Sequence, residues 1–306
     1  MTPGAEQLAS PGPGQGGSEV WTVLRLMEWS GEYLVGKGVE QGRLDAEHLL
    51  AHVTGIGRLE LYLQYDRPML AEELDRYRPF LKRRAGREPL QYILERAPFR
   101  HLELHVDPSV LIPRPETEVL LDEVLDWAKA EGREDMNALD LGTGSGAIAL
   151  SLALEGPFER VVATDTSQAA LEVARRNCAR AGLEDKLEFR HGAYYEPVDA
   201  SDEFDVIASN PPYVADGEGP SLQPEVRDWE PVQALFAGPD GLRALRTIVA
   251  GAGSWLVAGG LLALEVGLGQ AGLVAGLLED TSEYAEVRVR RDFTGRERMV
   301  LARRIG

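Results

Sequence analysis

The chain has 306 residues, an apolar fraction of 44%, a formal net charge of −18 and an isoelectric point of about 4.8. This length favours two domains, or one large domain with an appendage. A protein held to DNA or RNA through phosphates usually carries the opposite charge, so we expect no direct nucleic-acid substrate. The single cysteine, Cys178, excludes an intrachain disulfide and a cysteine-based zinc site, and we expect no bound metal.

The first 88 residues divide into two parts. Residues 1–19 are rich in Gly, Pro, Ser and Gln, which predicts a disordered tail. Residues 20–88 show apolar side chains at helical spacing without strand-like alternation, which predicts a small N-terminal helical bundle.

Two features indicate that the chain neither enters nor crosses a membrane. Residues 1–17 lack the apolar core of a signal peptide. The most apolar region, residues 255–278, is interrupted by Glu265, Gln270 and several glycines, and is therefore too polar to span a bilayer. We expect no membrane partner and a cytoplasmic location.

Residues 89–118 read as a connector with extended stretches at 102–106 and 110–112. Pro113 and Pro115 end any strand there, and Glu116 or Thr117 can begin a helix over residues 119–130. We therefore expect the last domain to occupy residues 119–306.

From residue 137 the chain alternates between strand and helix. The predicted strands are residues 138–141, 161–164, 187–190, 204–209, 261–266, 286–291 and 298–303. The predicted helices between them are residues 147–154, 168–181, 242–255 and 270–279. This alternation predicts an α/β fold with an open, mostly parallel sheet covered on both faces. The final hairpin makes one edge antiparallel.

A glycine-rich loop lies where the first of these strands turns into a helix. It comprises Asp140, Leu141, Gly142, Thr143, Gly144, Ser145 and Gly146. Asp165 ends the next strand, 19 residues after Gly146, where a carboxylate can accept hydrogen bonds from ribose hydroxyls. The dinucleotide fingerprint has two residues between its second and third glycines, whereas this loop has one. S-adenosylmethionine therefore fits the loop better than a dinucleotide.

The tetrapeptide Asn210, Pro211, Pro212 and Tyr213 directly follows a buried strand. The prolines stiffen the loop and favour an extended Asn210, so the amide oxygen and a free backbone carbonyl can converge. Two such acceptors suit a planar –NH2 group, with Tyr213 able to stack on it. If strand order reverses at the first strand, this loop and the glycine loop share one crevice. The tetrapeptide then holds a weakly nucleophilic nitrogen in line with the methyl donor.

Specific motifs extend over residues 20–303 and resemble the bacterial peptide-chain-release-factor glutamine methyltransferases (PrmC/HemK). They comprise residues 87–92, 110–118, 140–146, 210–213, 225–226 with 229–231, 238–242 and 291–298. The Asn-Pro-Pro-Tyr element is shared with adenine and guanine amino-methyltransferases. The Ile-Pro-Arg-Pro-Glu-Thr-Glu connector and the helical N-terminal domain narrow the likeness to this family.

The resemblance implies a Rossmann-like, seven-stranded class I S-adenosylmethionine-dependent methyltransferase sheet. Its substrate would be the glutamine amide of the Gly-Gly-Gln motif in class 1 peptide chain release factors, docked with help from the helical domain. Residues 142–146, Asp140, Asp165, Tyr194 and Asn210 would hold the cofactor. Asn210 to Tyr213, with Asn210, Pro211 and Tyr213 as catalytic residues, would grip the glutamine, and Arg114 and Glu116 would line the cleft. The family usually has Gly-Asp-aromatic where this chain has Gly192-Ala193-Tyr194.

Two alternatives stay open at this point. One is a nucleic-acid exocyclic amino-methyltransferase, which the acidity of the chain disfavours. The other is an inactive cofactor-binding scaffold, which the intact Asn210 tetrapeptide disfavours. Labelled methyl transfer to a release factor or to duplex DNA distinguishes them.

Overall fold

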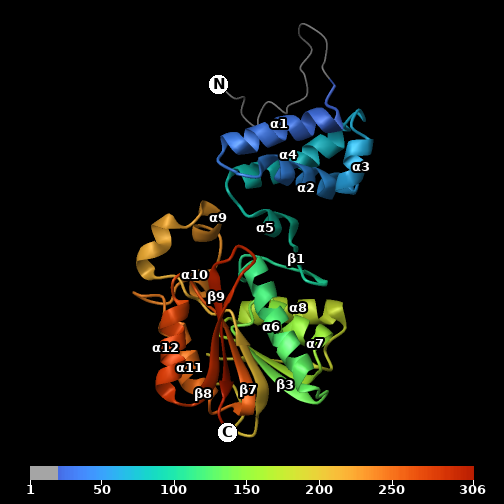
Figure 1. Cartoon of the computed structure of the whole chain (residues 1–306). Coiled ribbons are helices and arrows are strands. Elements are labelled where there is room, and N and C mark those ends of the chain that lie inside the picture. The colour runs from blue at the N-terminus through green and yellow to red at the C-terminus, as the bar shows by residue number, and fades with distance from the viewer. Residues whose placement is uncertain (1–19) are drawn as a thin grey trace. The chain divides into compact units, whose positions relative to one another are not determined.

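The computed structural model describes residues 20–306, so the predicted tail at residues 1–19 lies outside the described residues. The chain divides into two compact units, with the boundary between Glu95 and Arg96 (Figure 1). No helix in the described part is long and apolar enough to cross a membrane.

The first unit is helical. Its elements are α1 (Val23–Gly36), α2 (Gly42–Thr54), α3 (Arg58–Leu63), α4 (Ala71–Ala85) and α5 (Leu90–Leu94). Leucine and tyrosine side chains from these helices, including Leu26, Leu49 and Tyr77, are fully buried and form its core. A buried ion pair between Arg84 Nε and Asp45 Oδ2, 2.7 Å apart, joins α4 to α2. Apolar periodicity therefore gives a helical bundle here, as expected.

The second unit contains a seven-stranded sheet in the order β5-β4-β3-β6-β7-β9-β8. The strands are β3 (Met136–Leu141), β4 (Phe158–Asp165), β5 (Leu187–His191), β6 (Phe204–Ser209), β7 (Leu256–Glu265), β8 (Tyr284–Arg291) and β9 (Glu297–Arg304). Pairing is parallel from β5 to β7, and β9 is antiparallel to both of its neighbours. The expected α/β sheet with an antiparallel edge is confirmed.

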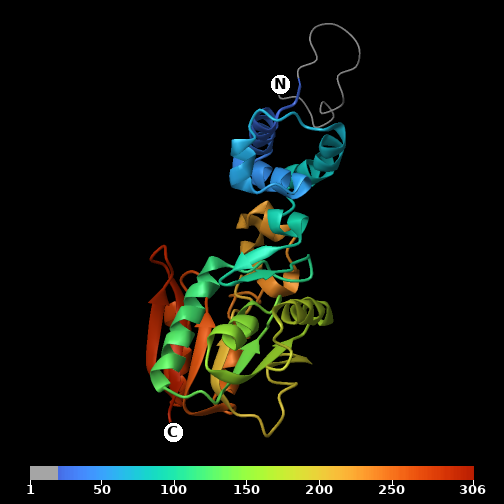
Figure 2. The same cartoon turned by 90° about the vertical axis from the view of Figure 1, so that its right-hand side faces the viewer.

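Helices cover both faces of this sheet. The helices α6 (Pro115–Glu131), α7 (Ala147–Glu155) and α8 (Gln168–Ala181) pack on one face, the side turned toward the viewer in Figure 2. On the other face lie α11 (Arg243–Ala252) and α12 (Ala271–Thr281). Successive residues of the central strands point to opposite faces: Ala138 packs in the first core and Leu139 in the second.

Strand order reverses at β3, which pairs in parallel with both β4 and β6. From β3 the chain continues to β4 and then to β5 at one edge of the sheet. It then returns to form β6 on the other side of β3. The loops after β3 and β6 therefore leave the same edge of the sheet side by side. This is the arrangement in which open α/β sheets bind ligands, and the expected reversal at the first strand of this sheet is confirmed.

The connector differs from the sequence prediction in three places. Helix α5 lies at Leu90–Leu94, and a short hairpin of β1 (Ala97–Phe99) and β2 (Leu102–Leu104) follows it. No strand forms at residues 110–112. Helix α6 begins at Pro115 with Arg114 as its N-cap, one turn earlier than predicted. A proline is favourable at the first helical position, because the N–H that it lacks has no partner there.

Short helices also follow the Asn210 tetrapeptide. They are η2 (Asp216–Ser221), α9 (Pro224–Arg227) and α10 (Val232–Leu235). Each has six residues or fewer, which is too short for apolar periodicity to reveal it in the sequence.

Candidate active site

The glycine loop between β3 and α7 has a strained backbone that only glycine adopts readily. Gly142, Gly144 and Gly146 have φ angles of +74°, +55° and +86°. The amides of Gly142 and Thr143 both donate to the Thr164 carbonyl at 2.9 Å. A Cβ added to Gly142 or Gly144 would meet no atom within 4 Å, so both face open space. The loop therefore presents bare backbone to a ligand.

Asp165, at the end of β4, closes one side of this loop. Its carboxylate accepts hydrogen bonds from the amides of Gly144 at 2.9 Å and Ser167 at 2.8 Å. Burial raises the pKa of Asp165 above its ordinary value, and these two amides act in the opposite direction. A carboxylate has about four acceptor sites, so Asp165 keeps acceptor capacity for a ligand hydroxyl.

Asp140 supports the loop from below. It is fully buried, and its Oδ2 accepts from Thr143 Oγ1 at 2.7 Å and from the Ala149 amide at 3.2 Å. Its Oδ1 has no hydrogen-bond partner among the described residues. Burial raises the pKa of Asp140 to about 7.

Asn210 directly follows β6. Its side-chain nitrogen Nδ2 donates to Thr117 Oγ1 at 2.9 Å, whereas its oxygen Oδ1 is buried and has no partner in the described chain. Ser209 Oγ donates to the Leu141 carbonyl at 2.6 Å, which ties the end of β6 to the end of β3. A buried amide oxygen without a donor costs free energy until a ligand supplies one.

A buried polar cluster adjoins Asn210 and consists of Thr117, Tyr213, Glu265 and Arg298. Thr117 Oγ1 donates to Glu265 Oε2 at 2.6 Å. Arg298 donates to the Tyr213 hydroxyl at 2.8 Å, and its guanidinium carbon lies 5.0 Å from the centre of the Tyr213 ring. Arg298 NH2 also lies 3.5 Å from Glu265 Oε1. Burial raises the pKa of Glu265 to about 7, while Thr117 and Arg298 act to lower it.

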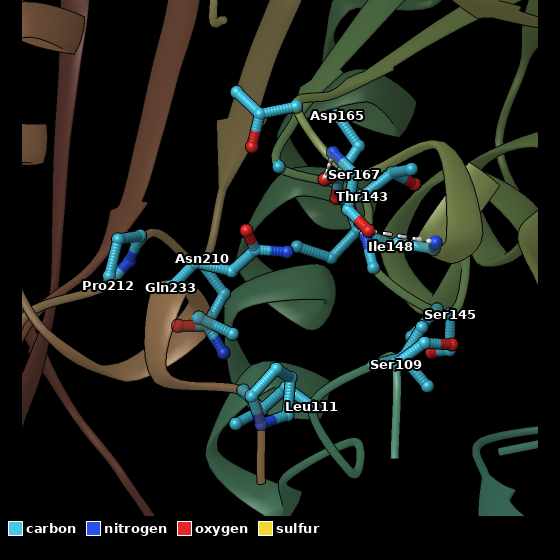
Figure 3. Close-up of a pocket in the computed structure, with 18 of the residues that line it drawn as sticks. Ser109, Leu111, Thr143, Ser145, Ile148, Asp165, Ser167, Asn210, Pro212 and Gln233 are labelled. Atoms are coloured by element: carbon cyan, nitrogen blue, oxygen red, sulfur yellow. Dashed lines mark hydrogen bonds between the residues drawn. The ribbon is translucent and has the colours of Figure 1, made fainter. Parts of the chain in front are cut away.

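One pocket of the second unit brings most of the predicted site residues together (Figure 3). The residues of the predicted site that line it are Gly142, Thr143, Gly144, Ser145, Asp165, Tyr194, Asn210 and Pro212. Figure 3 shows Thr143, Ser145 and Asp165 on one side of the pocket and Asn210, Pro212 and Gln233 on the other. The loops after β3, β4 and β6 thus converge on one cavity.

Six predicted site residues do not line this pocket. They are Asp140, Gly146, Pro211, Tyr213, Arg114 and Glu116. Asp140 lies under the loop, and Gly146 is the N-cap of α7, where a Cβ would lie 2.9 Å from Leu150 Cδ1. Tyr213 packs in the polar cluster, and Arg114 pairs with Glu230 at 2.5 Å.

Several residues at or next to the site were not predicted from the sequence. The most informative are Thr117, which accepts a hydrogen bond from Asn210, and Glu265, which accepts one from Thr117. A signal for Glu265 existed: it is an acidic residue at the carboxyl end of an apolar strand. The other lining residues that were not predicted include Ser109, Leu111, Pro113, Ile148, Ser167, Pro231, Gln233 and Ala234. Among residues 20–306 no group of three or more His, Cys, Asp or Glu side chains is placed to hold a metal ion.

The residues around the pocket fit S-adenosylmethionine. Open space lies in front of Gly142 and Gly144, where the methionine end would fit, and Asp165 would offer acceptors for the ribose. Tyr194, after β5, lines the same pocket, and its aromatic ring would lie near the adenine.

Solved structures share this fold. A methyltransferase from Pyrococcus furiosus matches with a TM-score of 0.51 and 21% identity, over 67% of this chain and 90% of that chain. The 16S rRNA N2 G1207 methyltransferase of Thermus thermophilus matches with a TM-score of 0.50 and 22% identity, over 68% of this chain and 49% of that chain. These likenesses show the fold alone, which is the seven-stranded sheet of class I S-adenosylmethionine-dependent methyltransferases.

Family comparisons are more specific. The PrmC N-terminal domain model matches residues 25–94, and the Methyltransferase small domain model matches residues 116–223. The release factor glutamine methyltransferase of Geobacter sulfurreducens is 42% identical, over 92% of this chain and 96% of its own length. That of Burkholderia pseudomallei is 44% identical, over 83% of this chain and 90% of its own length. The chain belongs to the release factor glutamine methyltransferase family, as the motifs of its sequence indicate.

Proposed function

We propose that this enzyme transfers a methyl group from S-adenosylmethionine to the side-chain amide nitrogen of a glutamine in class 1 peptide chain release factors. The glutamine is that of the Gly-Gly-Gln motif. The observation that carries the proposal is the unpartnered Asn210 Oδ1, on a residue that shares one pocket with the glycine loop and Asp165. A buried acceptor in that place is suited to an –NH2 group.

The residues of the pocket hold and orient the glutamine. An amide nitrogen is a poor nucleophile, because its lone pair is delocalised into the carbonyl group. Asn210 Oδ1 and the Pro211 carbonyl accept its two N–H groups, which increases electron density on nitrogen and fixes its direction. Orienting the reactants in this way lowers the activation barrier by about several kcal/mol, the order of magnitude known for well-oriented reactants. No strong base is required. The bound cofactor supplies an activated methyl group on a sulfonium.

The remaining assignments follow from the same substrate. We assign Pro212 to the wall next to the glutamine. Arg114 and Glu116 are assigned to the mouth of the cleft, outside the pocket lining. Tyr213 contacts Arg298 and Glu265, and we assign it to support of the Asn210 loop. The helical domain at residues 20–88 contributes to docking of the release factor. A protein substrate, rather than DNA or RNA, agrees with the net charge of −18. Release factors act in translation, so we place the enzyme in the cytoplasm.

Methyl transfer tests the proposal directly. The full chain is incubated with methyl-labelled S-adenosylmethionine and either a class 1 release factor or duplex DNA. Label in the release factor, located at the glutamine by mass spectrometry, is the expected result. Label in DNA alone would refute the substrate, and label in neither would favour a cofactor-binding scaffold.

The role of Asn210 is tested with a matched pair of variants. Asn210→Ala is expected to abolish transfer and leave the cofactor Kd unchanged, because its oxygen contacts the substrate amide. Asn137→Ala, which removes a half-buried asparagine from β3 at the end opposite the glycine loop, is expected to retain activity. Retained turnover of Asn210→Ala would contradict the assigned role.

A further inference from the structure

Three polar side chains from distant parts of the sequence form a buried chain of hydrogen bonds. Asn210, after β6, donates through Nδ2 to Thr117 Oγ1 at 2.9 Å. Thr117, in the first turn of α6, donates to Glu265 Oε2 at 2.6 Å, and Glu265 is the last residue of β7. Thr117 is 3% exposed and Glu265 is fully buried, so water does not compete for these bonds.

The direction of each hydrogen bond in this series follows from Glu265, which is the last acceptor. In its ionised form Glu265 only accepts, so the single hydroxyl proton of Thr117 then points at Glu265, which is the direction of the 2.6 Å bond. Thr117 Oγ1 then has only lone pairs left for Asn210, and only the –NH2 end of the Asn210 amide can donate to them. The amide oxygen is consequently turned to the opposite side, where it has no partner among the described residues.

The surroundings of Glu265 include a cation and several groups that affect its charge. Arg298, on β9, lies 3.5 Å from Glu265 Oε1, and the Tyr213 hydroxyl lies 3.4 Å from the same oxygen. Thr117 faces it from α6, and Glu116 on that helix adds a negative charge that opposes ionisation. Burial and Glu116 favour the neutral form of Glu265, whereas the Thr117 hydroxyl and Arg298 favour the charged, accepting form.

We propose that Thr117 and Glu265 are positioning residues that fix the Asn210 amide with its oxygen toward the substrate nitrogen. The proposal rests on the function proposed above. It adds an explanation of why the site prefers a substrate group that donates hydrogen bonds. Were the Asn210 amide turned over, its –NH2 end would face the incoming –NH2 group of the glutamine, and two donors would oppose each other.

Glu265→Gln tests the direction of these hydrogen bonds, because it changes the side-chain volume very little. A carboxamide can donate as well as accept. When its –NH2 end faces Thr117, the hydroxyl proton is free to point at Asn210, and the Asn210 amide is no longer held in one orientation. We therefore expect kcat to fall about tenfold or more, which corresponds to about 1.4 kcal/mol, while the cofactor Kd stays within about threefold.

Two threonine variants separate the hydroxyl from the packing. Thr117→Val keeps the shape but has no hydroxyl, and it is expected to lower kcat by about the same factor as Glu265→Gln. Thr117→Ser restores the hydroxyl and is expected to recover most of the activity. Thr247→Val, at an exposed threonine on α11, is the matched control, and it should behave as wild type.

A control carboxylate tests whether loss of any partly buried ion pair has the same effect. Glu155 pairs with Arg100 at 2.8 Å at the end of α7, outside the pocket. Glu155→Gln is expected to lower the thermal midpoint without lowering kcat. The proposal is overturned if Glu265→Gln and Thr117→Val keep the wild-type kcat, or if Thr117→Ser is as impaired as Thr117→Val.

A second measurement does not depend on methyl transfer. With asparagine labelled by ¹⁵N, the side-chain –NH2 resonances of Asn210 are assigned by their loss in Asn210→Ala. In wild type we expect one set of resonances with slow hydrogen exchange. In Glu265→Gln we expect a shifted or doubled set with faster exchange, and identical spectra would contradict the proposal. If wild type transfers no label to a release factor, the proposed substrate fails, while the NMR result still decides the positioning role.

Discussion

Asn177, on α8, makes three hydrogen bonds, one to the glycine loop and two to His105. It is buried, and its Oδ1 accepts from the His105 amide at 2.7 Å. Its Nδ2 donates to the His105 carbonyl at 3.0 Å and to the Ser145 carbonyl at 2.8 Å. One side chain therefore joins the connector, α8 and the cofactor loop. We predict that Asn177→Ala weakens both the fold and cofactor binding.

The expected magnitude follows from the number of bonds. Each intramolecular hydrogen bond contributes about 0.5–1.5 kcal/mol net, so the loss of three lowers the free energy of unfolding by about 1.5–4.5 kcal/mol. Release of the Ser145 carbonyl leaves the loop to be ordered when the cofactor binds, so the Kd for S-adenosylmethionine is expected to rise about tenfold, equivalent to about 1.4 kcal/mol.

Urea unfolding and isothermal titration with S-adenosylmethionine measure the two effects. Asn177→Asp is the informative companion variant, because it keeps the acceptor for the His105 amide and loses both donors. It places a carboxylate against two carbonyl oxygens, and it is expected to be at least as unstable as the alanine variant. An Asn177→Ala protein with unchanged unfolding free energy and unchanged cofactor Kd would refute the reasoning.

Three further predictions concern the same unit. Gly241→Ala is expected to lower the free energy of unfolding by about 2 kcal/mol or more in urea, because Gly241 has a φ of +71° and a Cβ there would lie 2.3 Å from the Tyr213 carbonyl. The raised pKa of Asp140 gives a stability contribution that is complete below the unfolded pKa and is lost as pH rises through about 7. The stability of wild type relative to Asp140→Asn should therefore fall between about pH 4 and pH 7, and a difference independent of pH would be contrary evidence. Asp165→Ala removes the acceptor for the ribose and for the Gly144 amide, so titration should show cofactor affinity reduced about tenfold or more.

The sheet and its glycine loop could be predicted because their signals are local. A buried strand is a short apolar run, and Gly142, Gly144 and Gly146 stand together at a turn whose backbone favours glycine. Asp165 follows the next strand at a spacing set by one helix. In each case the physical cause lies within about one βαβ unit, which is about 30 residues.

The cluster behind Asn210 could not be predicted, because its members meet only after folding. Thr117 and Glu265 are 148 residues apart, and Asn210 is 93 residues from Thr117. In the sequence, Thr117 reads as a residue that begins a helix, and Glu265 as an interruption of an apolar segment. These residues meet because α6 crosses the ends of β6 and β7. The spacing of apolar residues in the sequence does not indicate this crossing.

The position of β9 has a consequence for how the enzyme matures. This strand is last in chain order, yet it inserts between β7 and β8, and Met299 pairs with Glu265. Arg298 thus reaches the Glu265 carboxylate only after the ribosome has made every other strand of the sheet. Before residues 297–304 are synthesised, the Glu265 carboxylate has no partner from β9. The ion pair next to Asn210 therefore cannot form on a growing polypeptide until β9 has been synthesised.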